Sequence, residues 1–170
     1  GSFPSLRVSI FGGEALPVAA ALAWQEAAPH SIVDNHYGPT EVAVGCTVER
    51  LSDPANVTRG RGILALGPPH RGMSAAIVDA NGCFLSEAEM SAGQSGELAL
   101  SGPQVSPGYF RDPAQTASHF RTATHPVHGS GIWYVTGDVV YRDPSGHFHL
   151  LGRTDLRVKI LGHRIELEEV

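Results

Sequence analysis

The chain has 170 residues, of which 42% are hydrophobic and 17% charged, so we expect a soluble globular domain, or a large part of one. Its formal net charge of −5 gives no basic surface, and no apolar run is long enough to span a membrane, so we expect neither a nucleic-acid nor a membrane partner. The two cysteines, Cys46 and Cys83, fit no metal or redox spacing, which favours free thiols in a cytoplasmic protein.

The first predicted elements form the end of a helix-flanked α/β sheet. Residues 6–11 predict a strand that ends at two glycines, and Pro17 opens a helix that Pro29 closes. Residues 31–37 predict a second strand, so Gly13 and Tyr37 both lie at strand ends, where open α/β sheets bind ligands. Apolar residues at helical spacing predict the buried face of the helix, with Trp24 in the core: Leu16, Ala20, Ala23, Trp24 and Ala27.

A turn with the sequence NHYGPTE occupies residues 35–41. Its Gly-Pro step permits a rigid bend that brings Tyr37, Thr40 and Glu41 together. The aromatic ring can stack on a base, the hydroxyl can hydrogen-bond, and the carboxylate is a hard-oxygen ligand suited to Mg²⁺. Taken alone, the turn favours a nucleotide site no more than it favours a plain turn after a buried strand, with Glu41 solvated.

Beyond Glu49 the sequence predicts a β-rich, barrel-like region, because short β-runs alternate with clusters of Gly, Pro, Asn and Asp. Residues 113–120 predict a short helix, and residues 121–131, rich in His, Thr, Pro and Gly, predict a loop. Hairpin turns are predicted at residues 81–82 and 143–146. The expected strands are residues 74–79, 97–102, 132–136, 139–143, 147–151 and 156–160.

Two further motifs follow the turn, YVTGD at residues 134–138 and GRTDLRVKILGHRIELEEV at residues 152–170. In this order the three resemble the adenylate-forming superfamily of acyl-CoA synthetases, luciferases and the adenylation domains of nonribosomal peptide synthetases. FGGEALP at residues 11–17 and the segment at residues 96–120 resemble other parts of that family. Residues 164–167 are more similar to amino-acid-activating, carrier-loading members than to CoA ligases.

The resemblance implies an α/β (α+β) fold in three parts. Residues 1–50 would be the end of the sheet subdomain with the adenine- and Mg²⁺-binding turn, residues 51–152 a distorted β-barrel-like subdomain, and residues 153–170 the hinge and the start of a small C-terminal domain. Asp155 would be the hinge and has no chemical role. Gly162 would lie where the carrier's thiol arm passes, and Lys159 does not match the family's catalytic lysine.

The resemblance also implies ATP or AMP and Mg²⁺ as ligands. Thr40, Glu41 and Arg153 match catalytic positions, with Thr40 at the α-phosphate and Glu41 on Mg²⁺. The remaining nucleotide contacts are Asn35 at the adenine edge, Tyr37 stacked on the ring, the Gly12 and Gly13 backbone close to it, and Asp138 with Arg153 at the ribose. Two plainer interpretations compete: Asp138 as an ordinary turn aspartate, and Arg153 as a surface arginine paired with Asp155.

By the same resemblance, Ile10, Gly12, His36, Val44 and Gly45 line an acyl pocket. The two glycines would leave room for the substrate, whereas His36 is bulkier and more polar than the small residue often found there. His36 either faces a polar or aromatic edge of the substrate, or only narrows the pocket or satisfies a backbone carbonyl, and both readings stay open.

The reaction implied is ATP-dependent activation of a carboxylic acid, most closely an amino acid, as acyl-AMP, followed by transfer to a carrier protein's phosphopantetheine thiol, or to CoA. We expect the 170-residue chain alone to be inactive, because it shows neither the family's phosphate loop nor its small-domain lysine. The alternatives are a non-catalytic nucleotide- or carrier-binding module and a fragment of an acyl-CoA synthetase. The histidines at residues 125, 128, 147 and 149 favour a solvated loop and a solvent-facing strand rather than a metal site.

Overall fold

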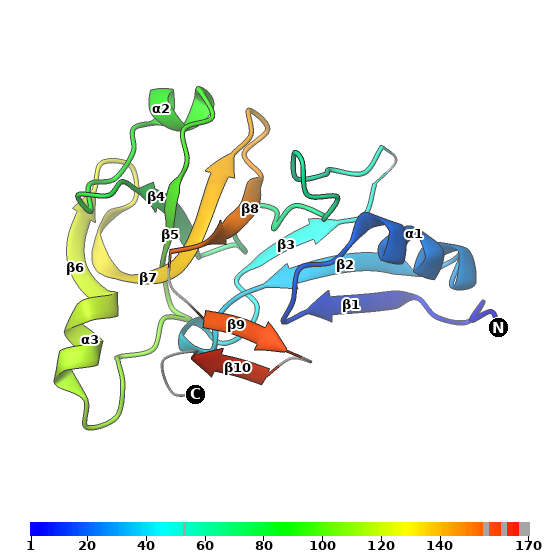
Figure 1. Cartoon of the computed structure of the whole chain (residues 1–170), viewed down its shortest axis with the longest axis horizontal. Helices are drawn as coiled ribbons and strands as arrows, with labels where there is room; N and C mark the ends of the chain where they lie inside the picture. The colour runs from blue at the N-terminus through cyan, green and yellow to red at the C-terminus, as the bar shows by residue number, and fades with distance from the viewer. Residues whose placement is uncertain (53, 155–156, 161–162, 167–170) are drawn as a thin grey trace.

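Two β-sheets meet at the turn that follows the second strand (Figure 1). The computed structural model describes residues 1–52, 54–154, 157–160 and 163–166. The first sheet contains β1 (Val8–Gly12), β2 (Ile32–Tyr37) and β3 (Thr47–Arg50) in the order β1-β2-β3. β1 and β2 are parallel, with Gly12 opposite His36, so both predicted strands end at the same edge, as expected. β3 runs antiparallel to β2 and was not predicted.

Helix α1 (Val18–Ala27) connects β1 to β2 and packs on one face of the first sheet. The predicted helix is confirmed, but its predicted buried face is only partly right: Ala20 and Ala23 are exposed, and Ala21 is fully buried. Nearly every residue of α1 is apolar, so the sequence pattern could not determine which side faces the sheet.

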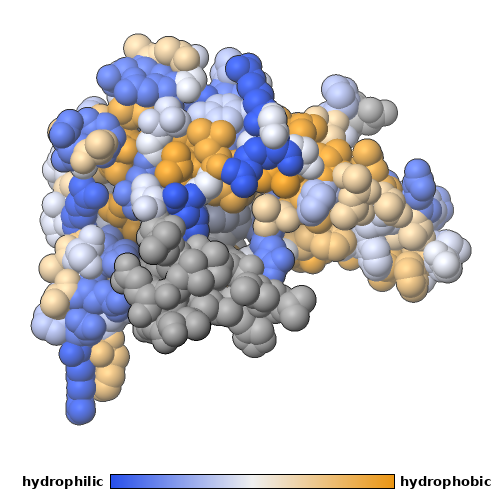
Figure 2. Space-filling model, in the orientation of Figure 1, coloured by the Kyte–Doolittle hydropathy of each residue, from blue (hydrophilic) through white to orange (hydrophobic). Residues whose placement is uncertain are grey.

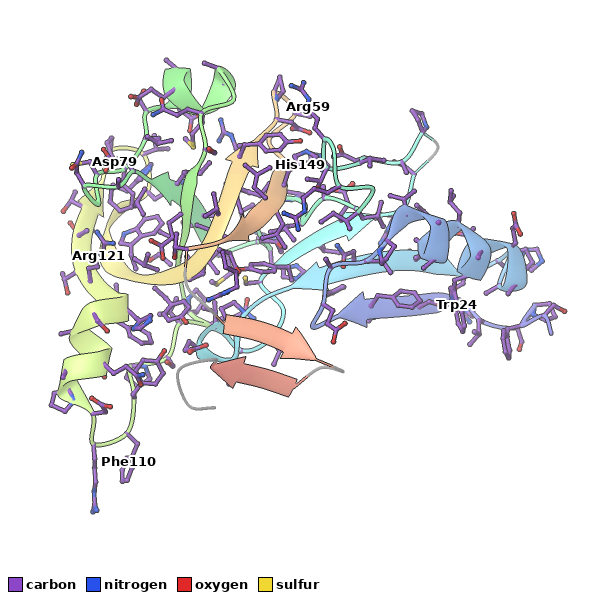
Figure 3. All side chains as sticks on the ribbon, viewed as in Figure 1. Trp24, Arg59, Asp79, Phe110, Arg121 and His149 are labelled. Atoms are coloured by element: carbon purple, nitrogen blue, oxygen red, sulfur yellow. The ribbon has the colours of Figure 1, made fainter. Side chains whose placement is uncertain are left out.

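Trp24 is half-buried beside β1, as Figure 3 shows. Its indole N–H donates to Ser9 Oγ at 2.7 Å, and its ring contacts Phe3 and Phe11. Trp24 therefore packs, as predicted, against a small hydrophobic core between α1 and the first sheet. This core contains Leu16, Ala21, Val33 and Leu64. Figure 2 shows hydrophobic residues at the surface over α1, where Leu22 is exposed.

The second sheet has the order β4-β5-β7-β6, with β8 also paired to β7. The strands are β4 (Ser74–Val78), β5 (Gly96–Ser101), β6 (Phe120–His125), β7 (Gly129–Arg142) and β8 (Phe148–Arg153), and the short helices are η1 (Thr40–Val42), α2 (Glu87–Ser91) and α3 (Pro113–His119). β9 (Arg157–Ile160) and β10 (His163–Glu166) form a separate antiparallel pair. Among the described residues this sheet is open, so the barrel-like prediction does not extend to a closed barrel.

Two predictions for this region were wrong. Residues 121–131, predicted as a loop, lie mostly in β6 and the start of β7, because the threonines of this stretch suit a strand and only residues 126–128 form the turn. The two strands predicted at residues 132–136 and 139–143 are one strand, β7, which continues through Gly137 at φ 79. Helix α2 was missed although Ser86 and Glu89 form its capping box.

The main core joins the turn after β2 to the second sheet. Val42 and Cys46 pack there with side chains from β5, β7 and β8, among them Leu98, Leu100 and Phe148. Burying each such side chain contributes roughly 1.5–3 kcal/mol, so the turn is anchored by packing as well as by hydrogen bonds. No helix within the described ranges has the length and apolar character needed to cross a membrane.

The prediction of a solvated loop and a solvent-facing strand is wrong for three of the four histidines: His125 and His149 are buried and His147 is half-buried, whereas His128 is exposed. His149 is 1% exposed, contacts Thr58 at 3.3 Å and Asp143 at 3.1 Å, and stacks on Tyr141 with ring centroids 4.6 Å apart. Figure 3 shows it near the loop that carries Arg59. His147 Nδ1 lies 2.5 Å from Glu49. His125 is also buried, and burial, followed by the nearby His128, lowers its pKa.

Candidate functional site

Strand β7 presents three residues of the YVTGD motif to the turn after β2. The strand bulges at Gly137, which has φ 79, so the positions of Tyr134, Thr136 and Asp138 depend on this bulge and not on simple alternation. All three are buried, and each interacts with a residue of the predicted site, as the following contacts show.

Asp138, in the second motif, contacts one residue from each of the other two motifs. Its Oδ1 accepts from Arg153 Nη1 at 2.5 Å, and its Oδ2 accepts from the Tyr37 hydroxyl. Arg153 Nη2 also donates to the Thr136 carbonyl at 3.1 Å. Burial raises the pKa of Tyr37, and the Asp138 charge adds to that effect, so the tyrosine stays a neutral donor. The structure therefore brings together three predicted nucleotide-binding residues from positions far apart in the sequence.

These contacts contradict the interpretation of Asp138 as an ordinary turn aspartate, whereas a pairing of Arg153 with Asp155 stays untested. Asp138 is only 8% exposed and is not a solvated turn residue. Arg153 pairs with Asp138, so it is not merely a surface arginine, while Asp155, its predicted partner in that interpretation and the predicted hinge, lies outside the described residues.

Gly38 allows the backbone at the end of β2 to pack directly against the backbone at residues 44–46. The Tyr37 carbonyl accepts from the Cys46 N–H at 2.8 Å. A Cβ on Gly38 would lie 2.5 Å from the Val44 carbonyl oxygen and 3.0 Å from the Cys46 nitrogen, both backbone atoms. Burial raises the pKa of the Cys46 thiol to about 12, so this residue is an uncharged packing group.

Asn35 is buried near the end of β2, two residues before Tyr37. Its side-chain Nδ2 donates to the Ala65 carbonyl at 2.9 Å, a contact that ties β2 to the segment at residues 63–66. Gly12, predicted beside the adenine, lies so close to β2 that a Cβ would be 2.9 Å from the His36 carbonyl oxygen. Gly13 follows with φ 90, a conformation that glycine adopts readily.

Thr40 and Glu41 lie in η1, directly after the Gly-Pro step. Thr40 is exposed, whereas Glu41 is 6% exposed, so the interpretation of Glu41 as a solvated residue was wrong. Its Oε1 accepts from the Tyr109 hydroxyl at 2.7 Å. A buried carboxylate next to a hydroxyl fits Mg²⁺, which commonly uses one or two protein carboxylates together with substrate phosphates. The described residues contain no cluster of three or more His, Cys, Asp or Glu that could hold a metal ion.

The predicted acyl-pocket residues divide between two segments. Ile10 and Gly12 share one face of β1, and His36 is paired with Gly12 on β2. Val44 and Gly45 follow η1, and a Cβ on Gly45 would meet His36 Nδ1 at 3.4 Å. Ile10 and Val44 are both exposed, so the predicted acyl-pocket residues are open to solvent at these two positions.

Sequence reasoning missed several residues at this site. The ring of His70 lies 5.5 Å from that of His36, and Tyr109 and Tyr134 border Glu41. The YVTGD motif could have pointed to Tyr134 and Thr136, since both belong to the same short segment as Asp138. His70 and Tyr109 belong to segments whose position the sequence does not determine.

A model of the family described as "AMP-binding enzyme" matches residues 1–110. Aldehyde reductase lnbA of Aspergillus flavus is 35% identical over 169 residues, which are 99% of this chain and 16% of that relative. Bacitracin synthase 3 of Bacillus licheniformis is 33% identical over 166 residues, or 98% of this chain and 2% of that protein. The chain thus corresponds to a small part of each of these proteins.

Solved structures agree with the fold. The Vibrio cholerae adenylation domain AlmE, in complex with glycyl-adenosine-5'-phosphate, has a TM-score of 0.83 and 37% identity, over 99% of this chain and 30% of that one. An NRPS protein containing adenylation and PCP domains has a TM-score of 0.82 and 27% identity, over 96% of this chain and 31% of that one. The chain belongs to the AMP-binding, adenylate-forming enzyme family and corresponds to a segment of an adenylation domain like those of nonribosomal peptide synthetases.

Proposed function

We propose that this chain forms one wall of the ATP site of an adenylation domain that activates an amino acid. The observation that carries the proposal is the convergence of Tyr37 and Arg153 on the Asp138 carboxylate. In the proposed reaction a substrate carboxylate oxygen attacks the α-phosphorus of ATP, a P–O bond forms, and pyrophosphate leaves with the electron pair. The thiol of a carrier protein's phosphopantetheine then attacks the acyl carbon, and AMP leaves.

The chain's own residues would position the reactants rather than bond to them. Asp138 would accept hydrogen bonds from the ribose hydroxyls, and Arg153 would donate to ribose or phosphate oxygens. Tyr37 would stack on adenine, with Asn35 at its edge and the Gly12 and Gly13 backbone beside it. Thr40 would donate to the α-phosphate, and Glu41 would hold Mg²⁺, which when bound neutralises phosphate charge.

Known adenylation proteins support the choice of substrate and partner. AlmE was solved with glycyl-adenosine-5'-phosphate, and the NRPS protein contains adenylation and PCP domains. We therefore propose an amino acid as the substrate and a phosphopantetheinyl carrier protein as the acceptor. Cys46 and Cys83 are both free thiols, which fits the proposed location in the cytoplasm.

The nucleotide site can be tested by calorimetric titration of AMP and ATP against the chain. We expect binding that is lost in Tyr37→Ala, because this change removes both the ring and the hydroxyl that contacts Asp138. A chain that binds neither nucleotide, or binds both equally after the substitution, would contradict the proposal. Binding of a carrier protein without any nucleotide binding would instead support a carrier-contact module.

His36→Ala should change which amino acids are activated. His36 lies between Gly12 and Gly45 and faces His70, so removing its ring enlarges the proposed acyl pocket. We expect preference to shift toward larger side chains by about 10-fold or more, the usual effect of pocket size on selectivity. The measurement is amino-acid-dependent ATP–pyrophosphate exchange by the adenylation domain that contains this chain, over a panel of amino acids. Unchanged preference would mean that His36 only supports its neighbours.

A further inference from the structure

The loop between β5 and α3 holds the turn that carries Glu41. Besides the hydroxyl contact of Tyr109 with Glu41 Oε1 at 2.7 Å, it makes two contacts with the turn's backbone. The Ser106 N–H donates to the Glu41 carbonyl at 2.8 Å, and Gln104 Nε2 donates to the Gly45 carbonyl at 2.9 Å. One loop thus fixes both ends of residues 41–45 and, through Tyr109, the carboxylate itself.

Tyr109 is in turn fixed by helix α3. Its backbone N–H donates to Thr116 Oγ1 at 2.9 Å, and its ring packs edge-on against Phe120 with ring centroids 5.6 Å apart. At the preceding residue, Gly108, a Cβ would lie only 2.5 Å from Thr116, so the loop and the helix are in direct contact. A side chain restrained in this way loses little conformational entropy when its hydroxyl donates to Glu41.

A second tyrosine, Tyr134, lies beside the Glu41 carboxylate. Tyr134 is 1% exposed, and Glu41 is itself 6% exposed. Glu41 therefore lies in a largely dehydrated setting, where a donor to a carboxylate oxygen has a stronger electrostatic effect than in water.

We propose that Tyr109 is a positioning residue that orients the Glu41 carboxylate toward the Mg²⁺ that accompanies ATP. The proposal rests on the role of Glu41 in the proposed function. A carboxylate that binds a metal through one oxygen needs the other held in place, and loss of such a hydrogen-bonding partner typically lowers metal affinity by about 10–100-fold.

The test uses Mn²⁺ as the probe, with free Mn²⁺ measured by electron paramagnetic resonance in the presence of the chain and ATP. Tyr109→Phe, which removes only the hydroxyl, should weaken Mn²⁺ uptake about 10-fold. The affinity for ATP in EDTA, measured by calorimetry, should stay the same. Tyr141→Phe is the matched control. Tyr141, in β7, is half-buried like Tyr109, but its hydroxyl accepts a hydrogen bond from the Arg59 N–H and does not contact Glu41.

Equal Mn²⁺ affinity in Tyr109→Phe and in the unaltered chain would overturn the proposal. A loss of ATP affinity in EDTA as large as the loss of Mn²⁺ affinity would also overturn it, because it would indicate a purely structural role for Tyr109. An unaltered chain that binds ATP in EDTA but takes up no Mn²⁺ would overturn the metal-positioning role and leave the nucleotide site standing. An unaltered chain that binds no ATP would contradict the proposed function and the positioning role together.

Discussion

Asp138→Asn should weaken AMP binding by about 100-fold or more, because a charged acceptor for two ribose hydroxyls is replaced by a neutral amide. A hydrogen bond to a charged group is worth about 1.5–3 kcal/mol, and two such bonds would be weakened together. The carboxylate is also the group that holds Arg153, through a contact of 2.5 Å, and Tyr37. The substitution therefore disturbs every part of the proposed ribose contact while keeping the shape of the side chain.

Calorimetric titration of AMP, with thermal unfolding of each variant, would measure this effect. Some loss of stability is expected in Asp138→Asn, since Arg153 is half-buried and loses its ion-pair partner. Glu26→Gln, an exposed position on α1, removes the same charge and should leave both measurements unchanged. Unaltered AMP affinity in folded Asp138→Asn would show that the ribose does not bind at this carboxylate.

Gly38→Ala should lower both stability and nucleotide affinity. The new Cβ would lie 2.5 Å from the Val44 carbonyl oxygen, and because these atoms belong to the backbone, the end of β2 and the backbone at residues 44–46 must separate. Overpacking of this kind costs about 3 kcal/mol at the upper end of its usual range. The separation would break the 2.8 Å hydrogen bond between the Cys46 N–H and the Tyr37 carbonyl, and so displace the Tyr37 ring.

Chemical denaturation and AMP titration of the same variant would test this prediction. Gly152→Ala is the matched control, because a Cβ there would meet only the end of the Arg61 side chain, at 3.7 Å. We expect Gly152→Ala to unfold at nearly the same denaturant concentration as the unaltered chain. Equal stability of the two glycine variants would contradict the account of the turn.

The motifs pointed to residues that the structure brings together, but not to what surrounds them. Tyr37, Asp138 and Arg153 lie in short motifs whose residue types suit a nucleotide, and the structure brings them together. The contact between Tyr109 and Glu41 joins residues 68 positions apart, and no local pattern encodes such a distance. Asn35 was expected at the adenine, yet its amide donates to Ala65, whose position depends on how the segment after β3 folds back.

The fold errors arise where contacts with distant segments decide the structure. The buried side of α1 was ambiguous because apolar residues surround the whole helix, and tertiary packing selected Ala21. Strand β6 resembled a loop in composition, and it forms because β7 offers a partner along its length. The histidines looked solvent-facing by alternation, but packing of the β7–β8 hairpin against the loop at residues 56–59 buries His149.

The most direct test of the central claim is to map AMP binding on the chain by ¹⁵N–¹H NMR. The account predicts that backbone amide shifts change at Tyr37 and Gly38, at Thr40 and Glu41, and at Asp138 and Arg153, because Tyr37 and Arg153 both contact the Asp138 carboxylate. Amides in α2 and at the β6–β7 turn should not change. Shifts confined to those distant segments, or the absence of any shift at saturating AMP, would contradict the account.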